Sequence, residues 1–501
     1  MNVATNLERS ALFFPDHPAI SRDGNETTYA RLDEQAGLIA SALVESGIAP
    51  GDHFGLCAAN STDWLAFYFG VLKAGAVAVT LSGALTFDEM ALLVGHSKPR
   101  MVFTDRAEEM ARILGAGADG RVISPGTALD TAAFSRRAKG PVKALDRDRT
   151  DVAAILYTGG TTGTPKGVML THENINVSAH NVAYSERSTE NDRALLFLPL
   201  NHVFGQMHIT NATILSAGCL ELIPSFNLDQ VLAILKEGRV TKLFAVPTVF
   251  TRLLALPDLK ERLGAVRYCF SAAASLPAEV IRRWKEVTGI DISEGYGMTE
   301  SASAVTYNHY YRHVVASVGE TVPGVEVQIR DLAGNRLPFG QEGEICIKGH
   351  NIMKGYLNNP EDTKAAFWPD GWYRSGDIGV LDEKGYLFIV DRLKDMIITG
   401  GENVYPREVE EAIYLMPEVQ ECAVVGAPDK DWGERVVAFI IPKEGRAIDA
   451  QAMKSFLKSR ISAFKVPKDY MVVKELPKNA AGKILKRELR AAGPAGGPGE
   501  K

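Results

Sequence analysis

The chain has 501 residues, 46% of them hydrophobic and 23% charged, and its net charge is −6. This length exceeds what one ordinary core accommodates, so we expect two or more domains. The mild negative charge excludes a general attraction for nucleic acid, and five scattered cysteines without a Cys-x-x-Cys pair exclude a disulfide framework and a zinc site.

The most apolar stretch, residues 64–81, carries Lys73 in its middle. A membrane span needs about 20 mostly apolar residues, so we predict a buried helix that turns into a strand here. The first residues lack the layout of a signal peptide. The sequence therefore predicts a soluble, cytoplasmic protein, leaves peripheral membrane contact open, and does not reveal the oligomeric state.

Helix-like and strand-like pieces alternate through the first 150 residues. An amphipathic pattern covers residues 29–46, and Gly47 is placed to end that helix. A short strand is predicted at 52–57. Such alternation is typical of α/β proteins with mainly parallel sheets. Residues 107–150 show little apolar periodicity, and we predict a variable surface excursion there.

The loop from Tyr157 to Gly167 holds four glycines, four threonines and one lysine, directly after the strand-like run 152–156. Glycines let backbone amides approach an anion, while threonine hydroxyls and the lysine add donors and charge. The lysine follows Pro165, so the loop is not a Walker motif. We predict a polyphosphate-binding loop, with an ordinary Gly/Thr-rich hairpin turn as the alternative.

This loop resembles the phosphate-binding loop of the adenylate-forming superfamily, which includes acyl-coenzyme A synthetases, peptide-synthetase adenylation domains and beetle luciferases. The resemblance implies that the loop binds the β- and γ-phosphates of ATP. The residues assigned to ATP here are Thr158, Gly159, Gly160, Thr161, Thr162, Gly163, Thr164 and Lys166.

A histidine lies in the apolar segment 198–205. Such a histidine is usually structural, but the segment and Gly205 suggest a strand-to-helix turn that presents the side chain to a cleft. In the family a histidine at this point lies beside the carboxylate and the α-phosphate, and His202 matches it. Residues 200–205 contain no acid to pair with a substrate ammonium, so an amino-acid substrate is disfavoured.

Two further motifs contribute to the nucleotide site that the resemblance implies. Small residues at 271–277 follow a strand-like run, and the family shapes its adenine and acyl pockets with this stretch. In the motif 294–300 an aromatic residue can stack on adenine, Thr299 can hydrogen-bond a phosphate oxygen, and Glu300 is a hard oxygen ligand suited to Mg²⁺. The residues assigned to ATP here are Ala273, Ala274, Glu294, Gly295, Tyr296 and Gly297.

A lone aspartate, Asp377, lies between two glycine-containing turns. It would ordinarily form a turn, but in the family it accepts both ribose hydroxyls, which requires an acceptor-only side chain. A charged break follows at 391–395. There the resemblance implies that Arg392 contacts the ribose or a phosphate and that Lys394 is the hinge, whereas Asp395 also fits a solvated loop.

Beyond the hinge, Gly401 matches the family position that lines the pantetheine tunnel, and Gly400 precedes it. Some relatives carry lysines where Ile398 and Gly400 stand, and their absence favours a fatty-acyl enzyme. Near the end of the chain, Lys483 matches the lid lysine of the family, which reaches the substrate carboxylate and the α-phosphate. A lysine in such a loop is otherwise merely solvated.

The predicted fold is α/β. A large N-terminal domain of packed mixed sheets and helices, residues 1–390, holds the ATP and acyl sites. A hinge at 391–395 connects it to a small, mobile α+β lid at 396–492, and residues 493–501 are predicted to form a disordered tail.

The resemblance implies an AMP-forming ligase that joins a carboxylic acid to coenzyme A, using ATP and Mg²⁺, with no nucleic-acid partner. Its catalytic residues would be Lys483, Thr299, His202 and Glu300, the last also binding the metal. The residues assigned to the acyl pocket are His202, Gly205, Ala272, Ala273, Gly297, Met298, Ser303 and Ala304.

Because the pocket residues are small or apolar, we expect an apolar acid. A medium- or long-chain fatty acid is the leading prediction, and an aromatic or alicyclic carboxylate is the next. Two further alternatives are an enzyme that loads an acyl group onto a carrier protein and a non-catalytic nucleotide-binding regulator.

Overall fold

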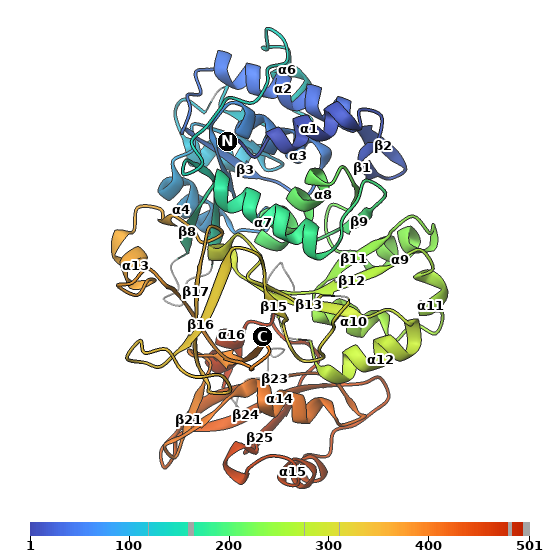
Figure 1. The fold of residues 1–501 in the computed structure, drawn as a ribbon, viewed down its shortest axis with the longest axis vertical. Coiled ribbons are helices and arrows are strands. Elements are labelled where there is room, and N and C mark those ends of the chain that lie inside the picture. The colour runs from blue at the N-terminus through green and yellow to red at the C-terminus, as the bar shows by residue number, and fades with distance from the viewer. Residues whose placement is uncertain (119, 159–164, 275, 310, 479–482, 494–501) are drawn as a thin grey trace.

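A computed structural model describes residues 1–118, 120–158, 165–274, 276–309, 311–478 and 483–493. Within these residues the strands form four sheets, with helices packed around them (Figure 1). The large N-terminal part contains three of the sheets, and the C-terminal part contains the fourth. The predicted α/β class, with a large N-terminal and a small C-terminal part, is confirmed.

The sheet that carries the phosphate loop has seven strands and is mainly parallel, as predicted. Its strands in spatial order are β18 (Gly355–Tyr356), β8 (Lys166–Thr171), β7 (Val152–Thr158), β4 (Val77–Thr80), β3 (His53–Cys57), β5 (Met101–Thr104) and β6 (Val122–Ile123). Only the β7–β8 and β8–β18 pairs are antiparallel. The phosphate loop is therefore the connection of an antiparallel hairpin at one side of a parallel sheet.

A second sheet of nine strands brings together residues from both ends of the large part. Its strands in spatial order are β15 (Glu320–Thr321), β14 (Thr306–Tyr307), β13 (Ile292–Tyr296), β12 (Tyr268–Ser271), β11 (Lys242–Ala245), β9 (Arg193–Leu196), β10 (Cys219–Leu222), β1 (Pro18–Arg22) and β2 (Asn25–Thr28). From β13 to β1 the neighbours run parallel. The carboxyl ends of β12 and β13 therefore meet at one edge, where such sheets bind ligands.

The remaining two sheets are smaller. The third is antiparallel, with β16 (Val325–Arg330), β17 (Gly343–Gly349), β19 (Tyr373–Leu381) and β20 (Leu387–Arg392). The fourth contains β21 (Ile397–Thr399), β22 (Glu402–Val404), β23 (Val419–Asp429), β24 (Gly433–Pro442) and β25 (Asp469–Val472). Strand β20 extends through Asp391 and Arg392, the first two residues of the predicted hinge at 391–395.

Helices cover these sheets. Those of the large part are α1 (Thr5–Phe13), α2 (Tyr29–Glu45), α3 (Thr62–Lys73), α4 (Phe87–Ser97), α5 (Ala107–Leu114), α6 (Thr131–Ser135), α7 (His172–Ser185), α8 (Ala212–Leu215), α9 (Leu228–Lys236), α10 (Pro247–Leu253), α11 (Leu259–Arg262), α12 (Ala278–Thr288) and α13 (Pro360–Ala365). Those of the small part are α14 (Pro406–Tyr414), α15 (Ala450–Lys458) and α16 (Lys486–Ala492). A π-helix, η1 (Phe204–Asn211), and two 3₁₀ turns, η2 (Thr299–Ser301) and η3 (Ala463–Lys465), complete the helical elements.

Local sequence accounts for several helix boundaries. The Thr28 side chain accepts a hydrogen bond from the backbone of Arg31 at the start of α2, and Gly47 follows its end with φ of +83°. The lysine that interrupts the apolar stretch, Lys73, is buried in ion pairs of 2.8 Å with Glu8 and Asp33. The predicted buried helix followed by a strand is confirmed as α3 and β4.

One prediction for the large part was wrong. Residues 107–150 contain α5, β6 and α6 rather than only a surface excursion. Met110, Ile123 and Phe134 are each fully buried in the cores. The apolar residues of these short elements are too few to show a clear period, but they complete the face of the seven-stranded sheet.

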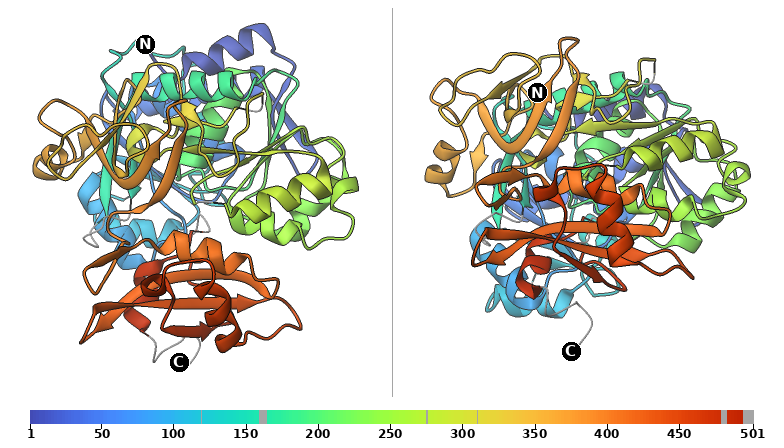
Figure 2. Two further views of the ribbon diagram at one scale, coloured as in Figure 1. Left: turned by 60° about the horizontal axis from the view of Figure 1, so that its bottom comes forward. Right: turned by 90° about the horizontal axis from the view of Figure 1, so that it is seen from below.

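The hydrophobic cores divide the described residues in the same way as the sheets. Two clusters of buried residues lie wholly between Val3 and Leu387, and two lie wholly between Ile397 and Leu489. Figure 2 shows the C-terminal sheet and its helices as a separate layered unit against the large part. This separation supports the division at 391–395, which remains a proposal.

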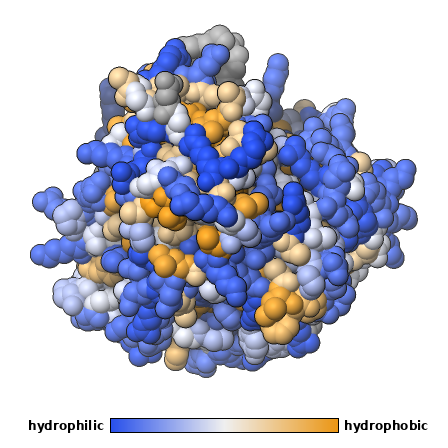
Figure 3. All heavy atoms as spheres, turned by 90° about the horizontal axis from the view of Figure 1, so that it is seen from above, coloured by the Kyte–Doolittle hydropathy of each residue, from blue (hydrophilic) through white to orange (hydrophobic). Residues whose placement is uncertain are grey.

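Three further observations concern the surface, the length and polarity of the helices, and the cysteines. On the face seen in Figure 3, hydrophobic residues lie in small groups among hydrophilic ones. None of the helices in the described part of the chain has both the length and the apolar character needed to traverse a bilayer. Each of the five cysteines is buried and free of a disulfide.

Candidate active site

The phosphate loop begins and ends on the paired strands β7 and β8, in which Thr158 stands opposite Lys166. The six predicted loop residues Gly159, Gly160, Thr161, Thr162, Gly163 and Thr164 lie outside the described residues. The side chain of Lys166 forms an ion pair of 2.7 Å with Asp362. Its ammonium group also lies 5.0 Å from the centre of the Tyr356 ring.

Tyr356 connects the loop lysine with the predicted metal ligand. Its hydroxyl donates a hydrogen bond of 3.0 Å to Glu300 Oε1. Tyr356 reaches this position because β18 pairs with β8, directly after the loop. Sequence reasoning missed both Tyr356 and Asp362, because they lie almost 200 residues beyond the loop and carry no motif of their own.

The environment of Glu300 fits a magnesium ion carried by ATP. Burial raises the pKa of this carboxyl, so a nearby cation would favour its ionised form. Among the described residues no group of three or more histidine, cysteine or acidic side chains gathers to hold a metal alone. Mg²⁺ is commonly bound by one or two carboxylates together with substrate phosphates. A single buried carboxylate such as Glu300 is compatible with that mode of binding.

The predicted nucleoside residues come from three strands and meet as a connected group. The Tyr296 hydroxyl, at the end of β13, donates to Asp377 Oδ2 at 2.7 Å. Asp377 on β19 stands opposite Arg392 on β20, and Arg392 Nε lies 3.5 Å from Asp377 Oδ1. The carboxylate that we assign to the ribose is thus held between an aromatic ring and a guanidinium group.

Close packing explains three glycines of the predicted site, two in the motif 294–300 and one in the segment 198–205. A Cβ atom on Gly297 would lie 1.2 Å from the carbonyl oxygen of Ser303. A Cβ on Gly295 would lie 2.8 Å from the Phe270 ring, and one on Gly205 would lie 2.4 Å from the Pro199 carbonyl oxygen. These three glycines bring backbone segments together where a larger residue would separate them.

The residues on the β12 side of the site are small, as predicted. Ala272 and Ala273 are half-buried, and Ala274 is exposed. Ala273 adopts φ of +71°, a left-handed conformation that an alanine adopts at a cost. Glu294 is buried, and burial raises its pKa to about 7 although the Leu276 backbone N–H donates to Oε1 at 3.3 Å.

The tautomer of His202 follows from its hydrogen bond. The backbone N–H of Phe204 donates to Nδ1 at 3.2 Å, so Nδ1 is the acceptor nitrogen. Burial and then the charge of Lys483 lower the pKa of His202 to about 4. The neutral imidazole therefore carries its proton on Nε2, which can donate to a substrate oxygen.

Lys483 brings the C-terminal part to this site. Burial, and after it the charge of Arg392, lower the pKa of Lys483 to about 7, while Asp377 opposes the shift. The same lysine lowers the pKa of His202. Lys483 therefore lies within electrostatic range of Arg392, Asp377 and His202, although it is 281 positions after His202 in the chain.

The predicted hinge residue Lys394 contacts α16, whereas the predicted tunnel residues Gly400 and Gly401 lie in an exposed turn of the C-terminal sheet. Burial lowers the pKa of Lys394, and Arg490 of α16 donates to the backbone oxygens of Lys394 and Asp395 at 3.2 and 2.9 Å. Gly400 and Gly401 form the turn between β21 and β22 with φ of +60° and +85°. A Cβ on Gly400 would meet the Trp432 ring at 2.5 Å, whereas one on Gly401 would meet no described atom within 4 Å.

A polar side chain, that of His208, lies next to the residues assigned to the acyl pocket. Ser303 adopts φ of +100°, and its hydroxyl lies 3.0 Å from His208 Nδ1. Ala304 is buried and Met298 is half-buried. Sequence reasoning missed His208, which lies outside the apolar segment 198–205, and its spacing of six residues from His202 does not predict that both side chains share one face of a helix.

Two family models match the chain in order. The AMP-binding enzyme model matches residues 7–357, and the AMP-binding enzyme C-terminal domain matches residues 408–483. The chain belongs to the AMP-binding enzyme family. This membership confirms the predicted adenylate-forming superfamily and the predicted enzyme class, an AMP-forming acid–thiol ligase.

Family members of known name resemble the chain over nearly its whole length. It is 36% identical to a feruloyl-CoA synthase of Amycolatopsis sp over 487 residues, which cover 96% of this chain and 97% of that relative. It is 34% identical to a long-chain-fatty-acid–CoA ligase of Bacillus subtilis (strain 168) over 527 residues, covering 96% and 93%. The ATP-bound crystal structure of MatB from Rhodopseudomonas palustris superposes with a TM-score of 0.91 at 36% identity, covering 98% and 99%.

Proposed function

We propose that the enzyme activates a carboxylic acid as its acyl-AMP and then transfers the acyl group to coenzyme A. The observation that carries this proposal is that Lys483, Asp377, Arg392 and His202 lie near enough for their charges to act on one another: the charge of Lys483 lowers the pKa of His202, and Arg392 and Asp377 act on the pKa of Lys483. This arrangement brings a cation from the C-terminal part to the place where two anions, the carboxylate and the α-phosphate, must meet. The ATP-bound and CoA-ligase relatives support the same chemistry.

In the first step a carboxylate oxygen attacks the α-phosphorus of ATP, and the bond to the departing pyrophosphate breaks. Lys483 would hold the carboxylate and the bridging oxygen, and the Nε2–H of His202 would donate to the carboxylate. Lys166 and the loop would hold the pyrophosphate. Glu300 would hold Mg²⁺ together with the ATP phosphates, and the ion would neutralise negative charge as it develops.

In the second step a thiol attacks the carbonyl carbon of acyl-AMP, the C–S bond forms, and AMP leaves with the electrons of the C–O bond. Lys483 blocks the approach that we assign to the thiol. We therefore propose that the C-terminal part rotates about residues 391–395, at Lys394, and presents Gly401 in place of Lys483. The open space around Gly401 supports its role as a tunnel residue.

The identity of the carboxylic acid is the more specific part of the proposal. The small residues of the pocket support an apolar acyl body, either a fatty acid or an aromatic acid. One similar relative is a fatty-acid ligase and another a feruloyl-CoA synthase, so the relatives support both classes. Loading of a carrier protein is the remaining enzymatic alternative, whereas family membership removes support for a non-catalytic regulator. Cytoplasmic location stays a prediction.

The test is AMP release from Mg²⁺-ATP with a panel of acids, with and without coenzyme A. The panel runs from acetate to palmitate and includes benzoate and 4-hydroxycinnamate. AMP release that requires both one acid class and coenzyme A supports the proposal. Pyrophosphate release without turnover on addition of coenzyme A would point to a carrier-protein acceptor instead.

A further inference from the structure

The side chain of Arg407 connects the C-terminal part with a residue that precedes the hinge. Arg407 is the second residue of α14, which lies on the side of the C-terminal sheet that is turned toward the large part (Figure 1). Its Nη1 donates a hydrogen bond of 2.5 Å to the backbone oxygen of Ile389 on β20. Since Ile389 comes before Lys394 and Arg407 comes after it, this bond spans the proposed axis of rotation.

The backbone of Arg407 makes a second contact of the same kind. Helix α14 begins with Pro406, and the side chain of its N-cap residue, Tyr405, makes no capping hydrogen bond. The backbone N–H of Arg407 instead donates to Asp391 Oδ2 at 2.8 Å. A carboxylate at this position satisfies an N–H that has no partner within the helix and interacts favourably with the helix dipole. The cap of α14 is thus supplied by β20, from the other side of the hinge.

A buried carboxylate next to the nucleotide motif lies within range of the same guanidinium group. Glu294 on β13 is 4% exposed, and burial raises its pKa, whereas the charge of Arg407 is the next largest influence and lowers it. Glu294 stands two residues before Tyr296, the aromatic residue that we assign to adenine. Arg407 therefore acts on two strands of the large part, β13 and β20.

An ion pair joins α14 to the segment that carries Lys483. Glu410, three residues after Arg407 on α14, lies 2.7 Å from Nζ of Lys486, the first residue of α16. The two side chains are 17% and 19% exposed, so water screens this pair only in part. Lys486 is three residues after Lys483. A displacement of α14 is therefore transmitted to Lys483.

The stability of the C-terminal part does not account for the contacts of Arg407. The larger hydrophobic core of that part includes three buried residues of α14, Val409, Ala412 and Ile413, and Arg407 is not among them. Within α14 the Nε of Arg407 also pairs with Glu411 at 3.0 Å, but Glu411 is 46% exposed and such pairs contribute little to stability. What remains are contacts that exist in one orientation of the two parts.

We propose that Arg407 is a positioning residue for the first half-reaction: it binds α14 to β20 and thereby holds Lys483 at the reacting groups. This inference rests on the proposed two-step function and on the proposed rotation about Lys394. Rotation would separate Arg407 from Ile389 and Asp391, so their bonds favour adenylation over thioester formation. Contacts that are made in one of two states set the ratio of those states.

The experiment measures the two half-reactions separately in Arg407→Ala, which keeps the backbone bond to Asp391 and removes the bond to Ile389. Single-turnover pyrophosphate release, with Mg²⁺-ATP and the acid that gives the most AMP, reports adenylation. AMP release from supplied acyl-AMP and coenzyme A reports thioester formation. The ratio of the first rate to the second should fall by about 10-fold, whichever orientation predominates, because loss of a hydrogen bond from a charged group changes an equilibrium by about that factor.

A second variant and a matched control separate positioning from a general effect on the fold. Arg407→Lys keeps the charge and a donor, so it should recover part of the wild-type ratio. Arg460→Ala is the control, because Arg460 is an exposed arginine of the C-terminal part whose hydrogen bonds to described residues go to Phe456 and Ser459 in the same part. It should keep the wild-type ratio.

A distance between the two parts gives a readout that does not depend on turnover. All five native cysteines are buried, so spin labels attach to cysteines introduced at two exposed positions, Glu286 on α12 and Lys458 on α15. Pulsed electron paramagnetic resonance without ligands then gives the populations of the two orientations. Arg407→Ala should move population from the orientation described here to a second one, and Arg460→Ala should leave the distances unchanged.

Each outcome decides the matter. A fall of the rate ratio in Arg407→Ala but not in Arg460→Ala, with a gain of the second distance, supports the proposal. An unchanged ratio, an equal fall of both rates, or a lower ratio without a change in the distances would overturn it and leave the ligase function intact. If no acid gives AMP release that depends on coenzyme A, the proposed function itself fails and this inference fails with it.

Discussion

Tyr356 and Glu300 are joined by a hydrogen bond of 3.0 Å, from the tyrosine hydroxyl to the carboxylate that we assign to Mg²⁺. The same aromatic ring lies under the ammonium group of Lys166. Tyr356 thus fixes both the proposed metal ligand and the charged residue of the phosphate loop. A single side chain therefore contacts both the loop lysine and the carboxylate that would hold Mg²⁺, and these two cations would neutralise the triphosphate.

Tyr356→Phe should weaken the apparent affinity of the enzyme for Mg²⁺ while it preserves the fold, because the ring stays and only the hydrogen bond is lost. We expect the Mg²⁺ concentration for half-maximal AMP release to rise by about 10-fold, the size of effect typical for a partner of a metal ligand. Magnesium titrations at saturating ATP and acid measure it. Tyr386→Phe is the matched control, because Tyr386 lies in the connection between β19 and β20, away from the site. Equal titration curves for the wild type and both variants would contradict the role of Tyr356.

The pKa of Lys483 predicts a pH profile. Because only the ammonium form attracts the two anions and its pKa is about 7, kcat/KM for adenylation should fall as pH rises above about 7. Bound ATP raises that pKa, so the fall in kcat should occur at higher pH. Lys483→Arg stays charged and should lose this alkaline fall at a lower overall rate. An unchanged alkaline limb in Lys483→Arg would assign the titration to another group.

Lys483 and Gly401 should affect different half-reactions. Lys483→Ala should lower the adenylation rate by about 10²–10³-fold, as loss of one transition-state donor does, and spare thioester formation from supplied acyl-AMP. Gly401→Leu should slow thioester formation from acyl-AMP and spare adenylation. Single-turnover assays of each half-reaction measure both effects.

Gly445→Leu is the control for Gly401→Leu, because Gly445 also has a positive φ, +70°, and open space around it in the same part of the chain. It carries the backbone strain of the substitution without the proposed obstruction. If both leucine variants slow thioester formation equally, or if Lys483→Ala slows both half-reactions equally, rotation of the C-terminal part would not be the explanation.

Glu294→Gln should stabilise the protein at high pH. Its folded pKa of about 7 exceeds the ordinary value of 4.5, so ionisation opposes folding, fully above pH 7 and not at all below about 4.5. The gain in unfolding free energy should therefore grow from about 1 kcal/mol at pH 5 to about 3 kcal/mol at pH 8, since one pKa unit corresponds to about 1.4 kcal/mol.

Urea unfolding at pH 5 and pH 8 tests this dependence on Glu294. The exposed Glu286→Gln on α12 serves as the control and should show no such pH-dependent gain. A gain for Glu294→Gln that is constant with pH would mean that packing, not ionisation, is responsible.

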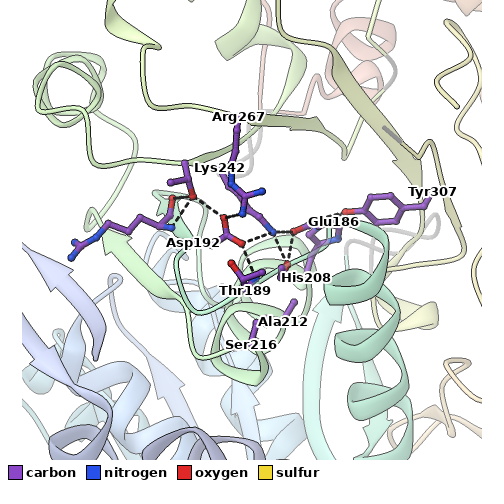
Figure 4. A network of polar contacts seen from close by, with 12 residues as sticks. Glu186, Thr189, Asp192, His208, Ala212, Ser216, Lys242, Arg267 and Tyr307 are labelled. Carbon is purple, nitrogen blue, oxygen red and sulfur yellow. Dashed lines mark hydrogen bonds and ion pairs between the residues drawn. The ribbon is translucent and has the colours of Figure 1, made fainter. Parts of the chain in front are cut away.

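Glu186, at the end of α7, and Lys242, on β11, form a buried ion pair of 3.1 Å (Figure 4). Glu186→Gln should destabilise the fold by about 3–5 kcal/mol, because Lys242 then keeps only its more distant buried partner, Asp192, at 3.5 Å. Lys242→Met should also destabilise it. The double variant should lose less than the sum of the two single losses, since neither charge is then left alone. Urea unfolding of the four proteins gives the coupling, and simple additivity would show that the two side chains do not act as a pair.

The sequence predicted those features that depend on residues close together in the chain. The helix ended by Gly47 and the buried helix with Lys73 are local patterns of polarity and backbone preference. The nucleotide motifs were found in the same way, because a phosphate loop needs consecutive glycines and threonines. The short elements at 107–150 were missed, since each buries too few residues to show a period.

Only the tertiary structure brings Tyr356 to Glu300 and Arg392 to Asp377. These contacts depend on strand pairing, which no local pattern encodes. The surroundings of Ser303 are the clearest case. Small residues predicted an apolar site, but His208 lies 3.0 Å from the Ser303 hydroxyl and is itself bound to Glu186, 22 residues earlier in the chain, by a buried hydrogen bond.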